Sequence, residues 1–112
     1  MSLSRIQKGQ WAENFVKDYL QKNNFICLAT NLKTPWAQID LLMKKPDGKW
    51  LILEVKYLSD FVDPLTRLNQ PQKQRLRRAQ RGLSARYNQI VGLGLAFVRP
   101  NQKIEFIDLD EF

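Results

Sequence analysis

The sequence predicts an α/β domain in which one helix, three strands, a second helix and two further strands form a single unit over residues 1–112. Three observations predict this order. Two stretches repeat apolar residues at intervals of three and four, as a helix with one buried face does. A Pro46-Asp47-Gly48 turn between two strand-like stretches predicts a hairpin. The second of these stretches, residues 49–58, is almost continuously apolar, which is typical of a central strand covered on both faces.

The two helices are expected over residues 8–22 and 71–88. Pro71 suits the first turn of the second helix, because the N–H groups there have no partner within the helix. The expected buried stripe of the first helix contains Ala12, Phe15, Val16, Tyr19 and Leu20. The expected buried stripe of the second helix contains Leu76, Ala79, Leu83, Tyr87 and Ile90.

The five strands are expected over residues 25–32, 36–44, 49–58, 91–99 and 103–109, with a loop over residues 59–69. Successive side chains of a strand point to opposite faces of the sheet. We therefore expect one face of the second strand to carry Ile39, Leu41 and Met43, and the other face to carry Asp40 and Leu42.

The composition excludes several classes of catalytic site. The chain has no histidine and one cysteine. Ser-His-Asp and Cys-His catalysis, zinc sites built on histidine or several cysteines, and an internal disulfide are therefore excluded. Cys27 lies in an apolar strand and is expected in the core. The single cysteine, the polar residues 1–8 and the lack of an apolar run of about 20 residues predict a cytoplasmic protein without a secretory signal or a membrane span.

Positive charge is concentrated in the second half of the chain. The net charge is +7, from 18 basic and 11 acidic residues. No Asp or Glu occurs between Asp63 and Glu105, an interval that holds half of the basic residues. Such a field attracts polyanions, chiefly nucleic acid or an anionic membrane surface, and we favour nucleic acid as the partner; the alternative is a solvated basic helix that only maintains solubility. The predicted nucleic-acid contacts are Lys33, Lys73, Arg75, Arg77, Arg78 and Arg81.

Two opposite charges interrupt the apolar third strand. Glu54 and Lys56 are two residues apart, so both lie on the same face, roughly 7 Å apart along the backbone. Asp40 lies in the hairpin partner strand, and it is as far from Asp47 in the turn as Glu54 is. The hairpin therefore places Asp40 opposite Glu54, about 5 Å apart at the backbone.

Two carboxylates this close repel each other, which raises the pKa of one of them unless a cation joins them. Mg²⁺ prefers oxygen ligands and retains waters and substrate phosphate. Lys56 would orient an attacking water or stabilise charge on the phosphate, and Glu13 on the first helix could reach the same site. The alternative is structural: Glu54 and Lys56 form an ion pair at a strand end, and Asp40 binds backbone amides.

Five sequence elements in order resemble the YraN-like family of small bacterial predicted endonucleases. That family belongs to the PD-(D/E)XK, restriction-endonuclease-like group and is similar to archaeal Holliday junction resolvases. The resemblance covers residues 9–106. The elements are Gly9-x-x-x-Glu13, Asn31-x-Lys33, Ile39-Asp40-Leu41-Leu42, Glu54-Val55-Lys56 and Lys73-x-x-x-x-x-Ala79.

The resemblance implies a restriction-endonuclease-like fold, with a central mixed five-stranded sheet flanked by two helices, and DNA as the partner. It also implies that Asp40 and Glu54 hold Mg²⁺ or Mn²⁺ and that Lys56 is the catalytic lysine. Glu13 would be the helical acid and Lys73 a phosphate contact. Resolvase-like relatives pair as homodimers, and by analogy a homodimer is expected here.

Two positions depart from the family pattern. Ala37-Gln38 stands where the family usually has Gly-Glu ahead of Ile-Asp, so one negative charge beside the site is missing. Tyr57-Leu58 follows Lys56, where basic residues are common in the family.

Three functions compete at this point. The first is a metal-dependent endonuclease that hydrolyses DNA phosphodiester bonds, with branched or junction DNA as a candidate substrate. The second is a non-catalytic nucleic-acid-binding module on the same fold, whose salt-sensitive binding would survive Glu54→Ala. The third is a protein-interaction domain with an incidental basic face, which would not bind DNA. Tryptophans could stack on bases, but we favour packing, with Trp36 and Trp50 near one another across the hairpin.

Overall fold

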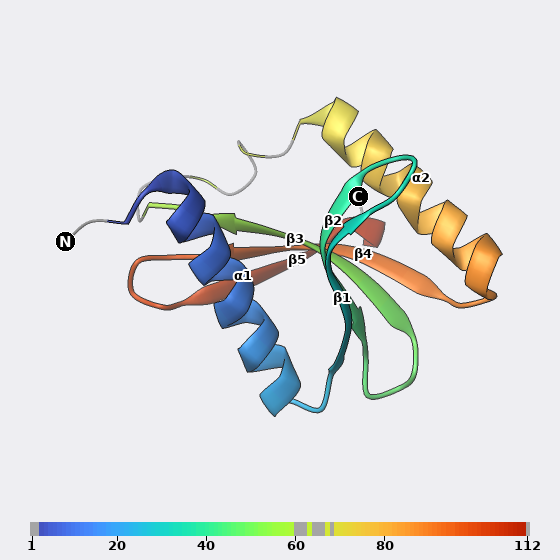
Figure 1. Ribbon diagram of the computed structural model, residues 1–112, viewed down its shortest axis with the longest axis horizontal. Coiled ribbons are helices and arrows are strands. Elements are labelled where there is room, and N and C mark those ends of the chain that lie inside the picture. Colours follow the sequence, from blue (N-terminus) through green and yellow to red (C-terminus); the bar gives the residue numbers. More distant parts are fainter. Residues whose placement is uncertain (1–2, 60–62, 64–66, 68, 112) are drawn as a thin grey trace.

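The computed structural model describes residues 3–59, 63, 67 and 69–111. Within them the elements follow the predicted order α-β-β-β-α-β-β, and a short 3₁₀ helix, η2, ends the described chain (Figure 1). Most of the loop expected over residues 59–69 lies outside the described residues. The elements are α1 (Arg5–Lys22), β1 (Ile26–Lys33), β2 (Gln38–Lys44), β3 (Trp50–Tyr57), α2 (Gln70–Tyr87), β4 (Val91–Val98), β5 (Ile104–Asp108) and η2 (Leu109–Glu111).

The five strands form one sheet in the order β1-β2-β3-β4-β5. The β3–β4 pair is parallel and every other pair is antiparallel, so the sheet is mixed, as the resemblance implied. The α2 crossover between β3 and β4 is what makes that pair parallel, because parallel neighbours need a long connection. The almost continuously apolar β3 is the middle strand, as its composition predicted.

Each helix begins at a polar cap. Ser4 accepts a hydrogen bond from the Gln7 N–H, and the Gln7 side chain accepts one from the Ser4 N–H. This capping box starts α1 at Arg5, three residues before the expected start. Asn69 caps α2 by accepting from Gln72 N–H, and Pro71 lies in the first turn as predicted.

The helices cover opposite faces of the sheet (Figure 1). One apolar cluster joins α1 through Ala12, Val16 and Leu20 to Leu41, Met43, Leu53, Val55, Ala96 and Val98. The other joins α2 through Leu76, Ala79 and Leu83 to Ile52, Leu93, Leu95, Phe97 and residues around them. Cys27 is half-buried against the α1 cluster. None of the described helices is long and apolar enough to cross a membrane.

Some expected core positions are wrong. Tyr19, Tyr87 and Ile90 are 47%, 48% and 67% exposed, because the buried stripe of each helix is narrower than the apolar pattern suggested and α2 ends at Tyr87. Tyr87 instead packs its ring against Trp50, with ring centroids 5.4 Å apart. Trp36 lies against α2 at Gly82, so the two tryptophans pack separately.

Strand β2 departs from the expected alternation at one residue. Leu41 and Met43 pack in the α1 cluster and Leu42 in the α2 cluster, as predicted. Ile39, expected beside Leu41, joins the α2 cluster. The alternation therefore changes between Ile39 and Leu41, the two neighbours of Asp40.

Candidate active site

The hairpin register places Asp40 and Glu54 together, as the sequence predicted. The observed pairs between β2 and β3 run from Lys44–Trp50 to Leu41–Leu53, and Asp40 and Glu54 come next in that register. At this point Oδ2 of Asp40 accepts a 2.8 Å hydrogen bond from the main-chain N–H of Val55. The side chain of Asp40 thus binds the neighbouring strand directly, and this contact holds the carboxylate beside Glu54.

Glu54 is the one charged residue that is buried among the described residues, with 7% of its surface exposed. Burial, a hydrogen bond with the Asp40 carboxyl group and the negative charge of Asp40 together raise the pKa of Glu54 to about 9, and burial is the largest cause. The positive charge of Lys56 acts in the opposite direction. Near neutral pH, without a cation, Glu54 is therefore protonated and shares its proton with Asp40.

Lys56 lies two residues beyond Glu54 on β3, on the same side of the strand, and is half-buried. Within the described part of the chain it forms no salt bridge and no hydrogen bond through its side chain. Its charge nevertheless favours the ionised form of Glu54. The ammonium group is thus close enough to act on the site without being held by a carboxylate.

Glu13 of α1 approaches the pair from the other side of the sheet. Partial burial and the charge of Asp40 raise the pKa of Glu13, and a hydrogen bond with the Asn31 side chain lowers it. Glu13 also raises the pKa of Glu54. Asn31 has φ 50, a left-handed conformation in an otherwise extended strand, and it lies across from Asp40 in the β1–β2 register. Backbone strain of this kind is common at functional sites.

A pocket of about 200 Å³ contains the two carboxylates. Its wall is completed by the segment before β2 and by the first turns of α2, so three parts of the chain meet there. The lining residues are Ala37, Gln38, Asp40, Glu54, Gln72, Arg75 and Leu76. Gln38 thus gives this pocket a neutral amide at the position where the family resemblance led us to expect an acid.

The donor set suits a hard divalent cation. Among the residues that the structure describes, no three Asp, Glu or Cys side chains gather closely enough to form a complete metal cluster. Asp40 and Glu54 offer a pair of carboxylate oxygens, and one cation between them would offset the burial and the repulsion that raise the pKa of Glu54. Mg²⁺ typically takes one or two protein carboxylates and fills its remaining positions with water and phosphate.

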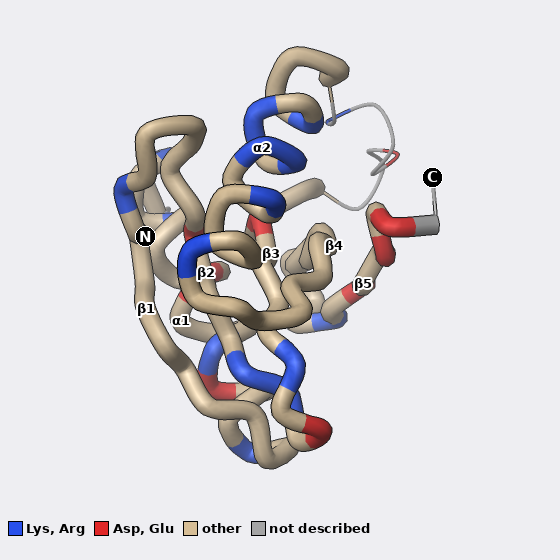
Figure 2. The backbone as a smooth tube through the Cα atoms, turned by 90° about the vertical axis from the view of Figure 1, so that its right-hand side faces the viewer, with Lys and Arg blue, Asp and Glu red and all other residues tan. Residues whose placement is uncertain are grey.

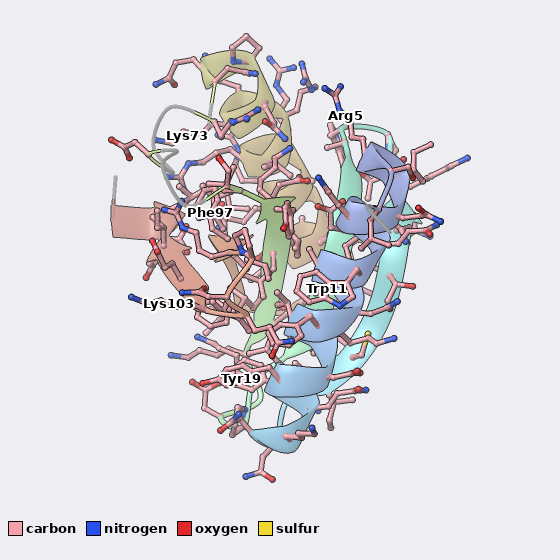
Figure 3. The ribbon with its side chains drawn as sticks, turned by 90° about the vertical axis from the view of Figure 1, so that its left-hand side faces the viewer. Arg5, Trp11, Tyr19, Lys73, Phe97 and Lys103 are labelled. Carbon is pink, nitrogen blue, oxygen red and sulfur yellow. The ribbon has the colours of Figure 1, made fainter. Side chains whose placement is uncertain are left out.

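The predicted basic contacts divide into two groups. Arg75 lines the acidic pocket, whereas Lys73, Arg78 and Arg81 border a groove of about 480 Å³ on α2 with Gln70, Gln74 and Arg77. Figure 2 shows basic positions recurring along α2, and Figure 3 shows Lys73 on the upper part of that helix. Lys33 lies apart, exposed at the end of the edge strand β1.

Arg77 has a structural role in the fold. Its guanidinium donates a 2.9 Å hydrogen bond to Asp110 and a further one to the carbonyl of Leu109. Asp110 also accepts from Gln80 and from the Leu93 N–H, so this network ties α2 and β4 to η2. A nucleic-acid contact by Arg77 remains a prediction, and it would compete with these bonds.

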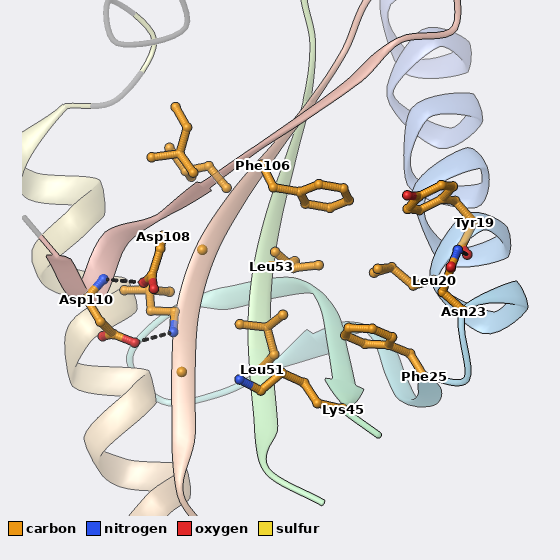
Figure 4. Close-up of a pocket in the computed structure, with 15 residues that line it drawn as sticks. Tyr19, Leu20, Asn23, Phe25, Lys45, Leu51, Leu53, Phe106, Asp108 and Asp110 are labelled. Carbon is orange, nitrogen blue, oxygen red and sulfur yellow. Dashed lines mark hydrogen bonds between the residues drawn. The ribbon is translucent and has the colours of Figure 1, made fainter. Parts of the chain in front are cut away.

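A larger and mostly apolar pocket, about 450 Å³, lies elsewhere (Figure 4). It is bordered by the last turns of α1 and by β3, β4 and β5, where Gly92 and Gly94 lie against Leu51 and Leu53. Tyr19 and Phe106 approach each other across it, with ring centroids 6.1 Å apart. Neither Asp40 nor Glu54 lines this pocket, so we do not consider it the candidate active site, although it is larger than the acidic pocket.

Sequence reasoning missed two residues of the site. Gln72 lines the acidic pocket, and only the packing of α2 on the sheet reveals this. Asn31 was matched as part of a family motif, but it was given no role. The residue type of Asn31 could have indicated its conformation, because asparagine is enriched among residues with a left-handed backbone.

Comparison with known sequences gives one consistent family. The sequence profile described as "Uncharacterised protein family UPF0102" matches residues 12–107. A UPF0102 protein of Shewanella halifaxensis is 33% identical over 82 residues, which are 70% of this chain and 71% of the relative. A UPF0102 protein of Thermodesulfovibrio yellowstonii is 35% identical over 79 residues, which are 68% and 69% of the two chains.

Comparison with solved structures gives the same fold at low sequence identity. Hjc, a Holliday junction resolvase of Archaeoglobus fulgidus, superposes with a TM-score of 0.61 and 16% identity, over 87% of this chain and 75% of Hjc. EndoMS, solved in complex with double-stranded DNA, gives a TM-score of 0.52 and 14% identity, over 85% of this chain and 36% of EndoMS. At these identities the likeness concerns the fold.

Proposed function

This chain belongs to the uncharacterised protein family UPF0102, and from that membership, its fold and its acidic pocket we propose that it is a metal-dependent nuclease that hydrolyses DNA. Hydrolysis adds water across one P–O bond of the backbone and leaves a phosphate on one end and a hydroxyl on the other. Branched DNA is the first substrate to test, because a neighbour in fold is a Holliday junction resolvase.

One observation carries the proposal. Asp40 and Glu54 lie in one pocket, and the pKa of Glu54 is raised to about 9 by burial and by Asp40. A structural ion pair between Glu54 and Lys56 would have lowered that pKa below its ordinary value, which is the reverse of what is found. Two carboxylates that repel each other in a pocket open to solvent are what a cation site requires.

We propose that Asp40 and Glu54 hold one Mg²⁺ or Mn²⁺. When bound, such an ion lowers the pKa of a water and stabilises negative charge on a phosphate oxygen. The hydrogen bond from Val55 N–H fixes the Asp40 carboxylate, so that its orientation is set before any ion arrives. Glu54 itself is buried, and charge interactions are stronger at a buried carboxyl group than in bulk water.

Lys56 is the proposed catalytic lysine. Since no carboxylate in the described residues holds it, its ammonium group can orient the attacking water or donate to the phosphate as charge develops there. Glu13 is proposed as a supporting acid, held by Asn31, that adds negative charge on the α1 side of the site.

DNA as the partner is supported by the basic helix beside the pocket. Lys73, Arg78 and Arg81 lie on α2, the same helix that supplies Arg75 to the pocket wall. Basic side chains in such a row contact backbone phosphates, so binding should weaken as salt rises. Contact between Lys33 and nucleic acid remains a prediction. The formation of a homodimer, as in resolvase-like relatives, also remains a prediction.

Cleavage of defined DNA tests the proposal. Four-way junction and linear duplex DNA would be incubated with the protein in Mg²⁺, Mn²⁺ or EDTA, beside Lys56→Ala and Glu54→Gln. We expect cleavage in either metal, none in EDTA, and a loss on the order of 1,000-fold or more in both variants. Cleavage that is unchanged by EDTA and by Lys56→Ala would refute the proposed metal-dependent hydrolysis.

A non-catalytic nucleic-acid-binding module remains the second candidate, and Gln38 in the pocket wall favours it, because the pocket lacks one expected acid. This function predicts DNA binding that falls with salt, no cleavage in any metal, and unchanged affinity in Glu54→Gln. The same experiment therefore separates the two functions.

A further inference from the structure

Arg75 lies between two features that the proposed function needs. It is an exposed residue of α2, yet it lines the same pocket as Asp40 and Glu54. Within the described residues its guanidinium forms no ion pair, although two carboxyl groups share its pocket. Arg75 is thus a cation beside the acidic pair that is not committed to either acid.

Two further arginines follow Arg75 along α2 at intervals of three residues. Residues three apart on a helix are surface neighbours, about 5–6 Å apart at Cβ. Arg75, Arg78 and Arg81 therefore form one slanting row on α2. Arg75 borders the acidic pocket, whereas Arg78 and Arg81 border the groove on the outer side of the helix. The row leads from the acidic pocket to the outer groove.

We propose that Arg75 binds the phosphate that reacts in the pocket, and that Arg78 and Arg81 bind the following phosphates of the same strand. The inference rests on the proposed nuclease function and names the substrate as a continuous nucleic-acid strand that crosses α2. A guanidinium suits this role because its planar set of N–H donors binds two phosphate oxygens at once.

The charges of the pocket explain why an arginine is needed there. Asp40, Glu54 and Glu13 act on one another electrostatically, and any negative charge that these acids carry repels a phosphate. Arg75 offsets the repulsion at the pocket wall, where the phosphate must enter. As negative charge builds on the phosphate oxygens during hydrolysis, the same donors bind more tightly, which lowers the barrier.

Neighbouring basic residues do not serve equally well. Arg77 faces the same outer groove, but its guanidinium is held by Asp110 and by the Leu109 carbonyl. Lys73 borders the outer groove and not the acidic pocket. Only Arg75, among the basic residues that the structure describes, lines the pocket with Asp40 and Glu54.

Binding in EDTA gives the first arm of the test, because it needs no cleavage. Affinity for a short duplex would be measured over a salt series for the wild type, Arg75→Ala, Arg75→Lys and Arg86→Ala. Arg86 is the matched control, since it lies in the last turn of α2, about 16 Å further along the axis. Arg75→Ala should lower the salt slope by about one phosphate contact, and Arg75→Lys and Arg86→Ala should leave it unchanged.

Single-turnover cleavage at saturating protein, in Mg²⁺, gives the second arm. Arg75→Ala should slow the saturated rate on the order of 100-fold, as the loss of one transition-state donor does. Arg75→Lys should also be slowed, because it keeps the charge and loses the paired donors. Arg81→Ala should bind more weakly but reach the wild-type rate once saturated. Thermal unfolding of each variant should match the wild type, because these side chains are exposed.

The two proposals fail in different ways. An unchanged salt slope in Arg75→Ala, or a wild-type saturated rate in that variant, overturns the role of Arg75 while leaving the nuclease in place. A wild type that never cleaves overturns the nuclease. In that case the salt slope alone decides whether Arg75 contacts phosphate.

Discussion

Oδ2 of Asp40 accepts a 2.8 Å hydrogen bond from the main-chain N–H of Val55, the residue between Glu54 and Lys56. A carboxylate on one strand is thereby fixed to the backbone of the strand that carries the other two charged groups. The side chain occupies a main-chain donor at the point where the observed β2–β3 pairs end. This contact holds the two acids close together, one residue away from Ile39, which departs from its expected face.

Asp40→Asn separates the charge of this carboxylate from its hydrogen bond, because the amide oxygen can still accept from Val55. Removing the negative charge should lower the pKa of Glu54 from about 9, although burial should keep it above the ordinary value of 4.5. Carboxyl ¹³C resonances followed over pH would measure the change. Asp47→Asn is the control, since Asp47 accepts from the Lys49 N–H in the turn, outside the pocket. If both variants left the pKa of Glu54 unchanged, Asp40 would not be acting on it.

The raised pKa of Glu54 also predicts how stability depends on pH. Between pH 4.5 and about 9, Glu54 is protonated in the folded protein and ionised in the unfolded chain. Unfolding then releases a proton, so in EDTA the free energy of unfolding should fall as pH rises, by at most about 1.4 kcal/mol per pH unit from this group. Urea denaturation over this range would measure the fall, and Glu54→Gln should flatten it. A wild type and a variant with parallel profiles would contradict the protonation state.

Asn31 offers a test of the strained backbone beside the site. Asn31→Ala should destabilise the protein by about 1–2 kcal/mol, because φ 50 is costly for alanine. Asn31→Gly should tolerate the backbone but lose the hydrogen bond to Glu13, so the pKa of Glu13 should rise further. Denaturant midpoints and carboxyl resonances would measure the two effects separately. Equal stability of the alanine and glycine variants would argue against strain at this residue.

Trp36 and Gly82 hold the segment that forms one wall of the pocket. A Cβ on Gly82 would lie 2.1 Å from the Trp36 ring, so Gly82→Ala must displace that ring, which directly precedes the pocket-lining Ala37 and Gln38. We expect a loss of about 1–3 kcal/mol in the free energy of unfolding. Gly9→Ala in α1 is the matched control, because a Cβ there meets nothing within 4 Å, and it should stabilise by about 0.5–1 kcal/mol. If both variants changed the free energy of unfolding in the same direction, the contact with the Trp36 ring would not matter.

Much of the fold could be predicted, because the helices and strands follow the local spacing of apolar residues and one turn sets the pairing of β2 with β3. The turn around Asp47 fixed the register, and the register placed Asp40 beside Glu54. The apolar run around Glu54 marked β3 as the central strand. The early start of α1 was missed because Ser4 stands before the apolar stripe begins, although its capping box with Gln7 could have been recognised.

The rest of the site depends on how α2 docks against the sheet. The sequence placed Arg75 and Gln72 on a basic helix, but the turn of that helix which meets the pocket is set by tertiary packing. The bond between Arg77 and Asp110 joins residues far apart in the chain, so no local pattern could distinguish Arg77 from its neighbours. The place of Asn31 opposite Asp40 likewise depends on how β1 pairs with β2.

The most direct measurement is a calorimetric titration of Mn²⁺ into the wild type and Glu54→Gln at pH 7, in two buffers of different ionisation enthalpy. With the pKa of Glu54 at about 9, ion binding must displace its proton. The wild type should therefore bind one ion and release close to one proton, and Glu54→Gln should bind far more weakly with no such release. Equal binding by both proteins, or binding by the wild type without proton release, would contradict the claim that Asp40 and Glu54 together form the metal site.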